Sequence, residues 1–206
     1  MRTWIKGGRV YISGKLQETD LLLEDGKICG FYPQGTPGSG DEVYDASGAY
    51  VVPGFVDIHT HGGFGADVNG ASCRDFEKIG HFFATQGTTS WLCSILTDTR
   101  EQTLYSIGEA LAHKRNHKNC ADLAGIHLEG PFLAPEYKGA MPEYLLRTAD
   151  VALVREYQEA ACGNIRYMTV SPEVFGVPEA IPQIKALGIA VAIGHSGADY
   201  ETAWKC

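Results

Sequence analysis

The chain has 206 residues, of which 44% are hydrophobic and 20% are charged, a composition that excludes a largely disordered chain. Its 17 basic and 25 acidic residues give a formal net charge of −8, which argues against nonspecific binding to nucleic acid or to anionic membranes. A small phosphorylated substrate is not excluded, because it needs only one or two local cations.

The cysteines and the first residues favour a cytoplasmic protein. No two of the six cysteines are close enough for a CxxC motif, and the first six residues lack the apolar segment of a secretory signal. No apolar run approaches the roughly 20 residues of a membrane span. We therefore expect free thiols in a reducing compartment. The cysteines are Cys29, Cys73, Cys93, Cys120, Cys162 and Cys206.

Residues 1–50 have the pattern of a small β-rich unit. Segments 9–13 and 20–32 contain strand-forming residues, and the Asp25-Gly26 dipeptide predicts a hairpin turn within the second segment. Residues 35–42 are rich in glycine and proline, and we expect a loop there.

From about residue 50 the pattern alternates between strands and helices. This alternation predicts parallel βαβ units, whose strands end in polar residues at the edge where parallel sheets bind ligands. The expected strands are Tyr50–Ile58, Thr88–Ile95, Ala124–Leu128, Ile165–Val170 and Ile189–Ile193. The expected helices cover 72–86, 101–116, 142–161 and 178–187, with another beginning near Asp199.

The number of these units leaves two architectures open. A (β/α)8 barrel takes about 250 residues, or about 31 for each unit. Residues 51–206 therefore supply about five units. They form either an open five-stranded sheet or the front part of a barrel, and periodicity alone does not choose between the two.

His59 and His61 are the strongest candidates for binding a metal ion. They end the first predicted strand, in the segment PGFVDIHTHGG, with Asp57 just before them. Alternate residues of a strand point the same way, so the two imidazoles share one face and can bind one divalent ion at about 2.0–2.2 Å. An HxH pattern is common by chance, but its place at a strand end favours metal binding.

Two further candidates follow later strands. Glu129 lies where the third strand ends, and a carboxylate among apolar neighbours is costly unless it is paired or metal-bound. His127, two residues earlier, is expected to be a hydrogen-bonded interior residue. His195 ends the fifth strand, between glycines that allow a tight turn. The predicted metal ligands are therefore His59, His61, Glu129 and His195.

The other polar candidates are expected to have structural or solvated positions. Ser171 and Glu173, in MTVSPE at the end of the fourth strand, are interpreted as structural groups. His81, His113 and His117 lie in helical patterns and are expected to be solvated.

Together these motifs resemble the amidohydrolase superfamily and, more finely, the N-acetylglucosamine-6-phosphate deacetylases. The similar segments are PGFVDIHTHGGFGAD, TTSWLCSILT, GIHLEGPFLAPEYKGAMPEYL, VSPE and GHSGADYETA, and the similarity extends over the whole chain. The resemblance implies a (β/α)8 TIM-type barrel of a metal-dependent hydrolase. Residues 51–206 would form about its first five βα units, and residues 1–50 the N-terminal part of a small β-sandwich domain.

The resemblance also implies the reaction and the site. N-acetylglucosamine 6-phosphate would lose its acetyl group to give glucosamine 6-phosphate and acetate, in the catabolism of amino sugars. One or two divalent ions, of zinc, iron, manganese or cobalt, would be bound in each subunit of a homodimer. Glu129 and His195 match ligands used throughout the family, and His59 and His61 match those of members with a second metal ion.

The KGA loop is the part of the resemblance that touches the substrate. Ala140 and Met141 fall in this loop, so the resemblance implies that both bind substrate. Some members have a histidine, thought to polarise the acetamide carbonyl, at the position of Met141. Methionine cannot donate that hydrogen bond. Carbonyl polarisation would then fall to the metal ion or to another group.

Several groups that the family uses have no match in these 206 residues. They are an aspartate general base after a late strand, a further histidine ligand, and the arginine and histidine that hold the phosphate. We therefore expect a truncated chain whose catalytic residues are unknown and which is a poor deacetylase by itself. The open alternatives are another amidohydrolase acting on a cyclic amide or amino-sugar amide, and a non-catalytic metal-binding remnant.

Overall fold

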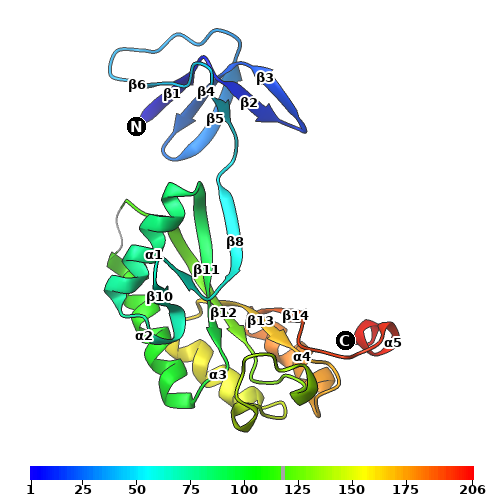
Figure 1. Cartoon of the computed structure of the whole chain (residues 1–206). Helices are drawn as coiled ribbons and strands as arrows, with labels where there is room; N and C mark the ends of the chain where they lie inside the picture. The colour runs from blue at the N-terminus through cyan, green and yellow to red at the C-terminus, as the bar shows by residue number, and fades with distance from the viewer. Residues whose placement is uncertain (117–118) are drawn as a thin grey trace. The chain divides into compact units, whose positions relative to one another are not determined.

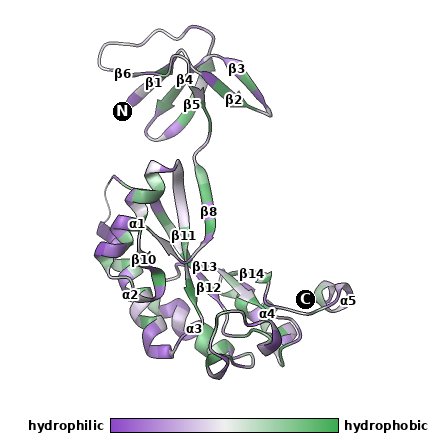
Figure 2. Cartoon of the chain, viewed as in Figure 1, coloured by the Kyte–Doolittle hydropathy of each residue, from purple (hydrophilic) through white to green (hydrophobic). Residues whose placement is uncertain are grey.

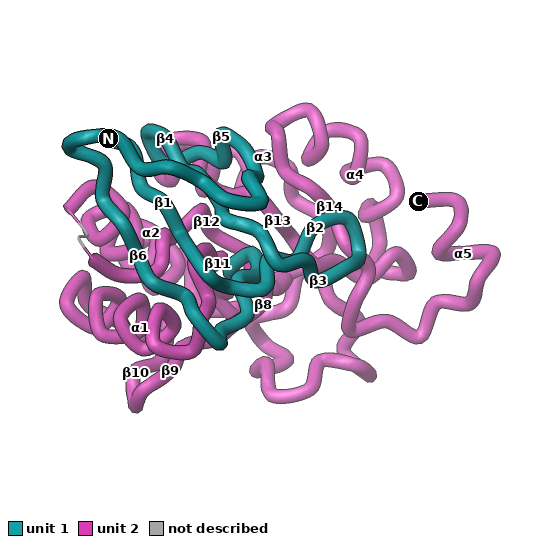
Figure 3. Tube along the Cα trace, turned by 90° about the horizontal axis from the view of Figure 1, so that it is seen from above, with its two compact units in different colours: residues 1–54 teal, residues 55–206 magenta. Residues whose placement is uncertain are grey.

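The computed structural model describes residues 1–116 and 119–206, which divide into two compact units, residues 1–54 and 55–206 (Figure 3). The boundary falls after Pro53-Gly54. None of the helices in the described ranges is both long and apolar enough to cross a bilayer.

The first unit is built from two small sheets. One has the order β5-β4-β1-β6 and the other the order β3-β2-β7. The predicted hairpin is confirmed, because Asp25 and Gly26 connect β4 and β5 with positive φ values of 49° and 75°, as the tight turns of hairpins require. The strands are β1 (Arg2–Lys6), β2 (Arg9–Ile12), β3 (Lys15–Glu18), β4 (Asp20–Glu24), β5 (Lys27–Tyr32), β6 (Glu42–Asp45) and β7 (Tyr50–Val51).

The second unit contains a five-stranded sheet in the order β14-β13-β12-β11-β8, with every neighbouring pair parallel. The strands therefore lie side by side in chain order. They are β8 (Phe55–Thr60), β11 (Thr88–Leu96), β12 (Asp122–Glu129), β13 (Ile165–Val170) and β14 (Ala190–Ile193). A short ribbon of β9 (Gly62–Gly63) and β10 (Ala66–Asp67) follows β8.

The helices between these strands decide between the two architectures left open by the sequence. Each helix contacts the next one along the chain from α1 to α4, which places them on one face of the sheet (Figure 1). Sequential parallel strands with α1 to α4 outside are typical of a barrel wall, so the sheet is a curled partial barrel. The helices are α1 (Cys73–Thr85), α2 (Arg100–Asn116), α3 (Val151–Ala160), α4 (Val177–Ala186) and α5 (Tyr200–Trp204).

The core lies between the helices and the convex face of the sheet. Trp91, Ile126 and Met168 from three neighbouring strands are 0–1% exposed, and Phe76 and Ile107 bury the inner faces of α1 and α2 against them. Figure 2 shows the hydrophobic residues along β12 and the hydrophilic ones on the outer helices. This core holds the carboxyl ends of the strands in place.

Two element predictions are corrected by the structure. The strand expected over Tyr50–Ile58 is two strands, because β7 pairs with β2 of the first unit and β8 begins only after Pro53, which lacks a backbone donor. The helix expected over 142–161 is confined to α3, where Asp150 caps the first turn by accepting from the Leu153 amide at 3.1 Å. The residues before it contain the short 3-10 turns Pro135–Tyr137 and Glu143–Leu145.

The three histidines expected to be solvated have different outcomes. His81 is exposed on α1, as expected. The prediction for His113 is wrong, because this residue is 1% exposed on the inner face of α2, where its ring stacks on Phe76 at 6.1 Å. His117 lies outside the described residues.

Candidate metal centre

The two histidines of the HxH motif lie at the end of β8. The His59 amide donates to the Asp57 carboxylate at 3.0 Å, and the Thr60 amide donates to the Ser94 hydroxyl of β11 at 3.0 Å. The Nε2 atoms of His59 and His61 are 3.2 Å apart. Both side chains are partly exposed, at 46% and 37%.

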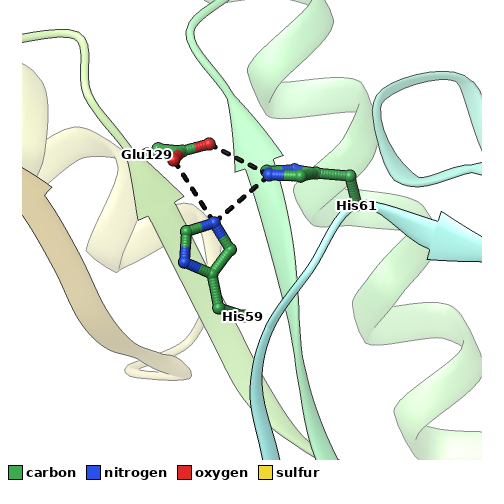
Figure 4. A group of neighbouring side chains, drawn as sticks. All are labelled: His59, His61 and Glu129. Atoms are coloured by element: carbon green, nitrogen blue, oxygen red, sulfur yellow. Dashed lines mark hydrogen bonds and ion pairs between the residues drawn. The ribbon is translucent and has the colours of Figure 1, made fainter. Parts of the chain in front are cut away.

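Glu129 ends β12, the middle strand of the sheet, and its side chain is only 5% exposed. Its Oε1 lies 3.2 Å from His59 Nε2, and its Oε2 lies 3.1 Å from His61 Nε2 (Figure 4). One ligand atom from each of these residues lies within 4.8 Å of the other two, which is the spacing of a metal-binding group.

His195 reaches the same carboxylate from the loop after β14. Its Nε2 is 3.0 Å from Glu129 Oε1, and its Nδ1 is 2.8 Å from the Tyr137 carbonyl oxygen. The backbone of His195 has φ 51°, in the left-handed region that disfavours residues with a Cβ. Such strained residues cluster at functional sites. The structure thus brings the three predicted histidines to Glu129, although in the described residues only His59, His61 and Glu129 have ligand atoms that all lie within 4.8 Å of one another.

The hydrogen bonds of His61 and His195 determine which ring nitrogen carries the proton. His61 Nδ1 is 3.1 Å from the Ser94 carbonyl oxygen, and His195 Nδ1 bonds the Tyr137 carbonyl oxygen. A carbonyl oxygen only accepts, so each Nδ1 donates and each neutral ring presents a lone pair at Nε2. These lone pairs face the acceptor oxygens of Glu129, an arrangement that requires a cation or added protons between them.

The electrostatics of the site agree with that requirement. Burial raises the pKa of the Glu129 carboxyl, but with added protons on their Nε2 atoms His61 and His195 donate hydrogen bonds that, together with the nearby imidazole charges, outweigh burial and lower this pKa to about 2. The hydrogen bond with Glu129 raises the pKa of His61. The carboxylate is therefore ionised at neutral pH, and the site attracts positive charge. Three imidazole nitrogens with one carboxylate form a donor set typical of divalent transition metals.

His127 is a buried, hydrogen-bonded interior residue, as predicted. Its Nδ1 lies 2.8 Å from the Ser94 hydroxyl and its Nε2 lies 2.8 Å from the Thr169 hydroxyl. Burial, together with the neighbouring His59, lowers the pKa of His127 to about 4. His127 is therefore a neutral residue beneath the cluster, in contact with the His59 ring at 4.7 Å between centroids.

Ser171 and Glu173 support the loop that carries His195. The Ser171 hydroxyl bonds the His195 carbonyl oxygen at 2.7 Å, and the Glu173 carboxylate accepts from the Ser196 hydroxyl and the Gly197 amide, both at 2.7 Å. These contacts agree with the structural role that the sequence indicated for both residues.

The KGA loop lies next to His195. A side-chain carbon added at Gly139 would be 3.5 Å from His195 Cε1, and Tyr137 supplies the carbonyl that bonds His195 Nδ1. Ala140 is exposed, whereas Met141 is buried at 3% exposure. The loop that the sequence associated with substrate is therefore adjacent to the candidate metal centre.

Sequence reasoning missed two contributors to the site, Ser94 and the Tyr137 carbonyl. Ser94 is a polar residue inside the apolar segment TTSWLCSILT, and that interruption was an available signal. The Tyr137 carbonyl belongs to the backbone, and no residue pattern indicates it.

The chain is similar to curated N-acetylglucosamine-6-phosphate deacetylases. It is 36% identical over 165 residues to the protein from Bacillus subtilis (strain 168), a match that covers 77% of this chain and 41% of that one. It is 32% identical over 209 residues to the protein from Bos taurus, covering 97% of this chain and 46% of the other. The chain thus spans about half the length of the curated relatives it matches. No family model matches the chain.

Solved structures show the same fold. A variant of N-acetyl-D-glucosamine-6-phosphate deacetylase from Mycobacterium smegmatis, in complex with N-acetyl-D-glucosamine-6-phosphate, has a TM-score of 0.85 and 26% identity, covering 99% of this chain and 52% of that one. A D-hydantoinase from Bacillus sp. AR9 has a TM-score of 0.56 and 22% identity, covering 93% of this chain and 39% of the other, which shows the fold alone. The predicted amidohydrolase barrel fold is confirmed.

Proposed function

We propose that this chain, which spans about half the length of the N-acetylglucosamine-6-phosphate deacetylases it is similar to, contributes a divalent metal centre to the deacetylation of N-acetylglucosamine 6-phosphate. The products of that reaction are glucosamine 6-phosphate and acetate, so the chain acts in amino-sugar catabolism. The observation that carries the proposal is the set of three imidazole Nε2 atoms within 3.0–3.2 Å of the buried Glu129 carboxylate.

We propose His59, His61, Glu129 and His195 as the metal ligands. A divalent ion at this position supplies the Lewis acidity that amide hydrolysis needs. The protein's contribution is orientation, because backbone carbonyls fix the rings of His61 and His195 and the core fixes Glu129. Glu129 meets His61 through Oε2 and the other two rings through Oε1, so these residues would hold one or two divalent ions.

Ala140 and Met141 are proposed to bind the acetamide end of the substrate. The support is their place in the loop that packs on His195. A Met141→His variant should change turnover or its dependence on the metal, because histidine adds a hydrogen-bond donor beside the site. An unchanged kinetic profile across substrates with different acyl groups would contradict this role.

The remaining parts of the proposal concern the assembly. Residues 1–50 are proposed to be the N-terminal part of a small β-sandwich domain, residues 51–206 the metal-dependent barrel portion, and the enzyme a cytoplasmic homodimer. Support for association comes from the outer strand β8, where Phe55, Val56 and Ile58 are 50–67% exposed. Light scattering of the purified chain measures its mass directly, and a monomer at all concentrations would contradict the dimer.

Metal content tests the centre. The wild-type chain should retain about one or two equivalents of a divalent ion after gel filtration, whereas Glu129→Gln and His195→Asn should retain much less. Glu159→Gln, an equivalent change on the exposed face of α3, is the matched control. If both site variants retained as much metal as the wild-type chain, the assignment of Glu129 and His195 as metal ligands would be wrong.

Acetate release from N-acetylglucosamine 6-phosphate tests the reaction. We expect slow release by this chain alone, because five strands with two open edges do not close a barrel whose strand number, tilt and shear must agree. Turnover at the ordinary enzymatic rate of about 1–1,000 per second would contradict that expectation. Preferred hydrolysis of a cyclic amide would instead indicate another amidohydrolase.

A further inference from the structure

Ser94 lies in the second half of β11, is fully buried, and contacts both the HxH segment after β8 and His127 on the strand that carries Glu129. In the sheet its register partner on β12 is His127, and its neighbour Cys93 is the register partner of Thr60 on β8. Ser94 is therefore placed between the strand that carries His59 and His61 and the strand that carries Glu129.

The hydroxyl of Ser94 belongs to a chain of hydrogen bonds that runs from the Thr60 amide through His127 to Thr169. The Thr60 amide donates to Ser94 Oγ, and in the described residues His127 Nδ1, 2.8 Å away, is the acceptor that the hydroxyl proton of Ser94 reaches. His127 Nδ1 then accepts, which leaves the ring proton on Nε2 to be donated to Thr169 Oγ1 at 2.8 Å. The chain connects β8, β11, β12 and β13 directly beneath the cluster.

The backbone of Ser94 acts on the same strand end. Its carbonyl oxygen accepts from His61 Nδ1 at 3.1 Å. Ser94 thus binds Thr60 through its side chain and His61 through its main chain, on consecutive residues of the HxH motif.

The pairing of β8 with β11 explains why a side chain is needed here. The register of these strands shifts between Thr88 and Ser90 and again between Trp91 and Cys93, so the regular ladder is interrupted next to the motif. β8 is also an outer strand of the sheet, pairing only with β11 in the part of the chain that the structure describes. The Thr60 amide is bound by a hydroxyl where a regular parallel ladder would offer a carbonyl.

We propose that Ser94 is a positioning residue for the metal centre, holding the His59–His61 strand end in line with Glu129 through Thr60, His61 and His127. The proposal rests on the proposed metal function. Hydrogen-bond partners behind metal-binding histidines typically change metal affinity by about 10–100-fold when removed. Ser94→Ala keeps the carbonyl that His61 Nδ1 meets and removes only the hydroxyl that binds Thr60 and His127, so we expect a weakening at the lower end of that range, about tenfold.

The test measures cobalt(II) binding to the metal-free 206-residue chain by visible absorption, which reports both affinity and ligand geometry. Ser94→Ala is compared with Ser106→Ala, a change on α2. Ser106 is another fully buried serine, and its hydroxyl donates to the Asn69 carbonyl at 2.8 Å. We expect Ser94→Ala to weaken binding about tenfold with an altered spectrum, and Ser106→Ala to change it less than about threefold. Equal affinities for Ser94→Ala and wild type would overturn the proposal.

A second pair of variants tests the far end of the hydrogen-bond chain if Ser94→Ala does not fold. Thr169→Val removes the hydroxyl that His127 Nε2 meets and keeps the shape, whereas Thr169→Ser keeps the hydroxyl. We expect Thr169→Val to weaken cobalt(II) binding and Thr169→Ser to restore it to near the wild-type value. Equal affinities for the two variants would show that the hydroxyl has no positioning role.

The imidazole nitrogen chemical shifts of the metal-free chain separate this proposal from the proposed function. If wild type binds no cobalt(II), the metal function fails, and the shifts then decide the role of Ser94. They should show His127 protonated at Nε2 in wild type and a mixture of tautomers in Ser94→Ala or, failing that, in Thr169→Val. Unchanged His127 shifts would overturn the proposal.

Discussion

The strand ends of β8 and β12 carry the same spacing of polar residues but use it differently. On β8, His59 and His61 both meet the Glu129 carboxylate and stay partly exposed. On β12, Glu129 enters the cluster, while His127, two residues earlier, is fully buried and bonds two hydroxyls beneath it.

Position within the sheet accounts for the difference. β12 has β11 and β13 on its two sides, so its residues are enclosed, and a polar side chain there must be satisfied by neighbours. Among the described strands β8 pairs with β11 alone, and the His59 and His61 side chains at its end are 46% and 37% exposed. The same two-residue spacing thus has two results. On β8 both histidines belong to the candidate metal centre, whereas on β12 only Glu129 does and His127 is an interior residue.

The largest expected effect is on the free energy of unfolding. It is tested by truncating Leu128 and Ile58, the apolar residues that precede Glu129 and His59. Leu128 is 3% exposed between His127 and Glu129, whereas Ile58 is 50% exposed before His59. Leu128→Ala should lower the free energy of unfolding by about 2–5 kcal/mol, because it leaves a cavity. Ile58→Ala should cost less than about 1 kcal/mol. Urea unfolding followed by circular dichroism measures both, and similar losses would contradict the enclosure of β12.

The next effect separates the two histidines of β8. The His61 ring is oriented by the Ser94 carbonyl, so it should contribute more to metal affinity than His59. We expect His61→Asn to weaken cobalt(II) binding about 100-fold and His59→Asn about tenfold. Titration of both variants under identical conditions measures the ratio. A larger loss for His59→Asn would show that the carbonyl does not orient the site.

A smaller effect concerns the strained backbone of His195, in the loop after β14. His195→Gly and His195→Ala remove the same imidazole, but only glycine adopts φ 51° without cost. The glycine variant should be about 1 kcal/mol more stable than the alanine variant, or about 2–4 °C higher in Tm. Calorimetry of the metal-free variants checks this, and equal Tm values would mean that the loop relaxes when the ring is removed.

The smallest effect contrasts a thiol inside the sheet with one at the surface. Burial raises the pKa of the Cys93 thiol to about 12, above its ordinary value of 9.0. The folded state therefore holds the proton of the Cys93 thiol more tightly than the unfolded state does. The stability that this difference provides is fully present below about pH 9 and is lost as the pH rises from about 9 to 12. At pH 8, iodoacetamide should modify exposed Cys162 and spare Cys93, as mass spectrometry of peptides would show. Rapid modification of Cys93 in the folded chain would indicate that the sheet opens there.

Much of the second unit was predictable from local patterns. Apolar runs located all five parallel strands, and the polar residues after them identified His59, His61, Glu129 and His195. Where prediction failed, a single local feature competed with the pattern. Pro53 separates β7 from β8, and Asp150 caps α3 well inside a pattern that looked helical from residue 142.

The sequence by itself determined which residue types stand at the strand ends, because chain order and period-two alternation are local properties. Only the tertiary structure decided how those residues are used. The register of β11 against β8 and β12 places Ser94 between the two halves of the site, and a backbone carbonyl of the KGA loop orients His195. Such contacts join residues 33 to 58 positions apart, and their partners are backbone groups that every residue carries, so no pattern of side chains indicates them.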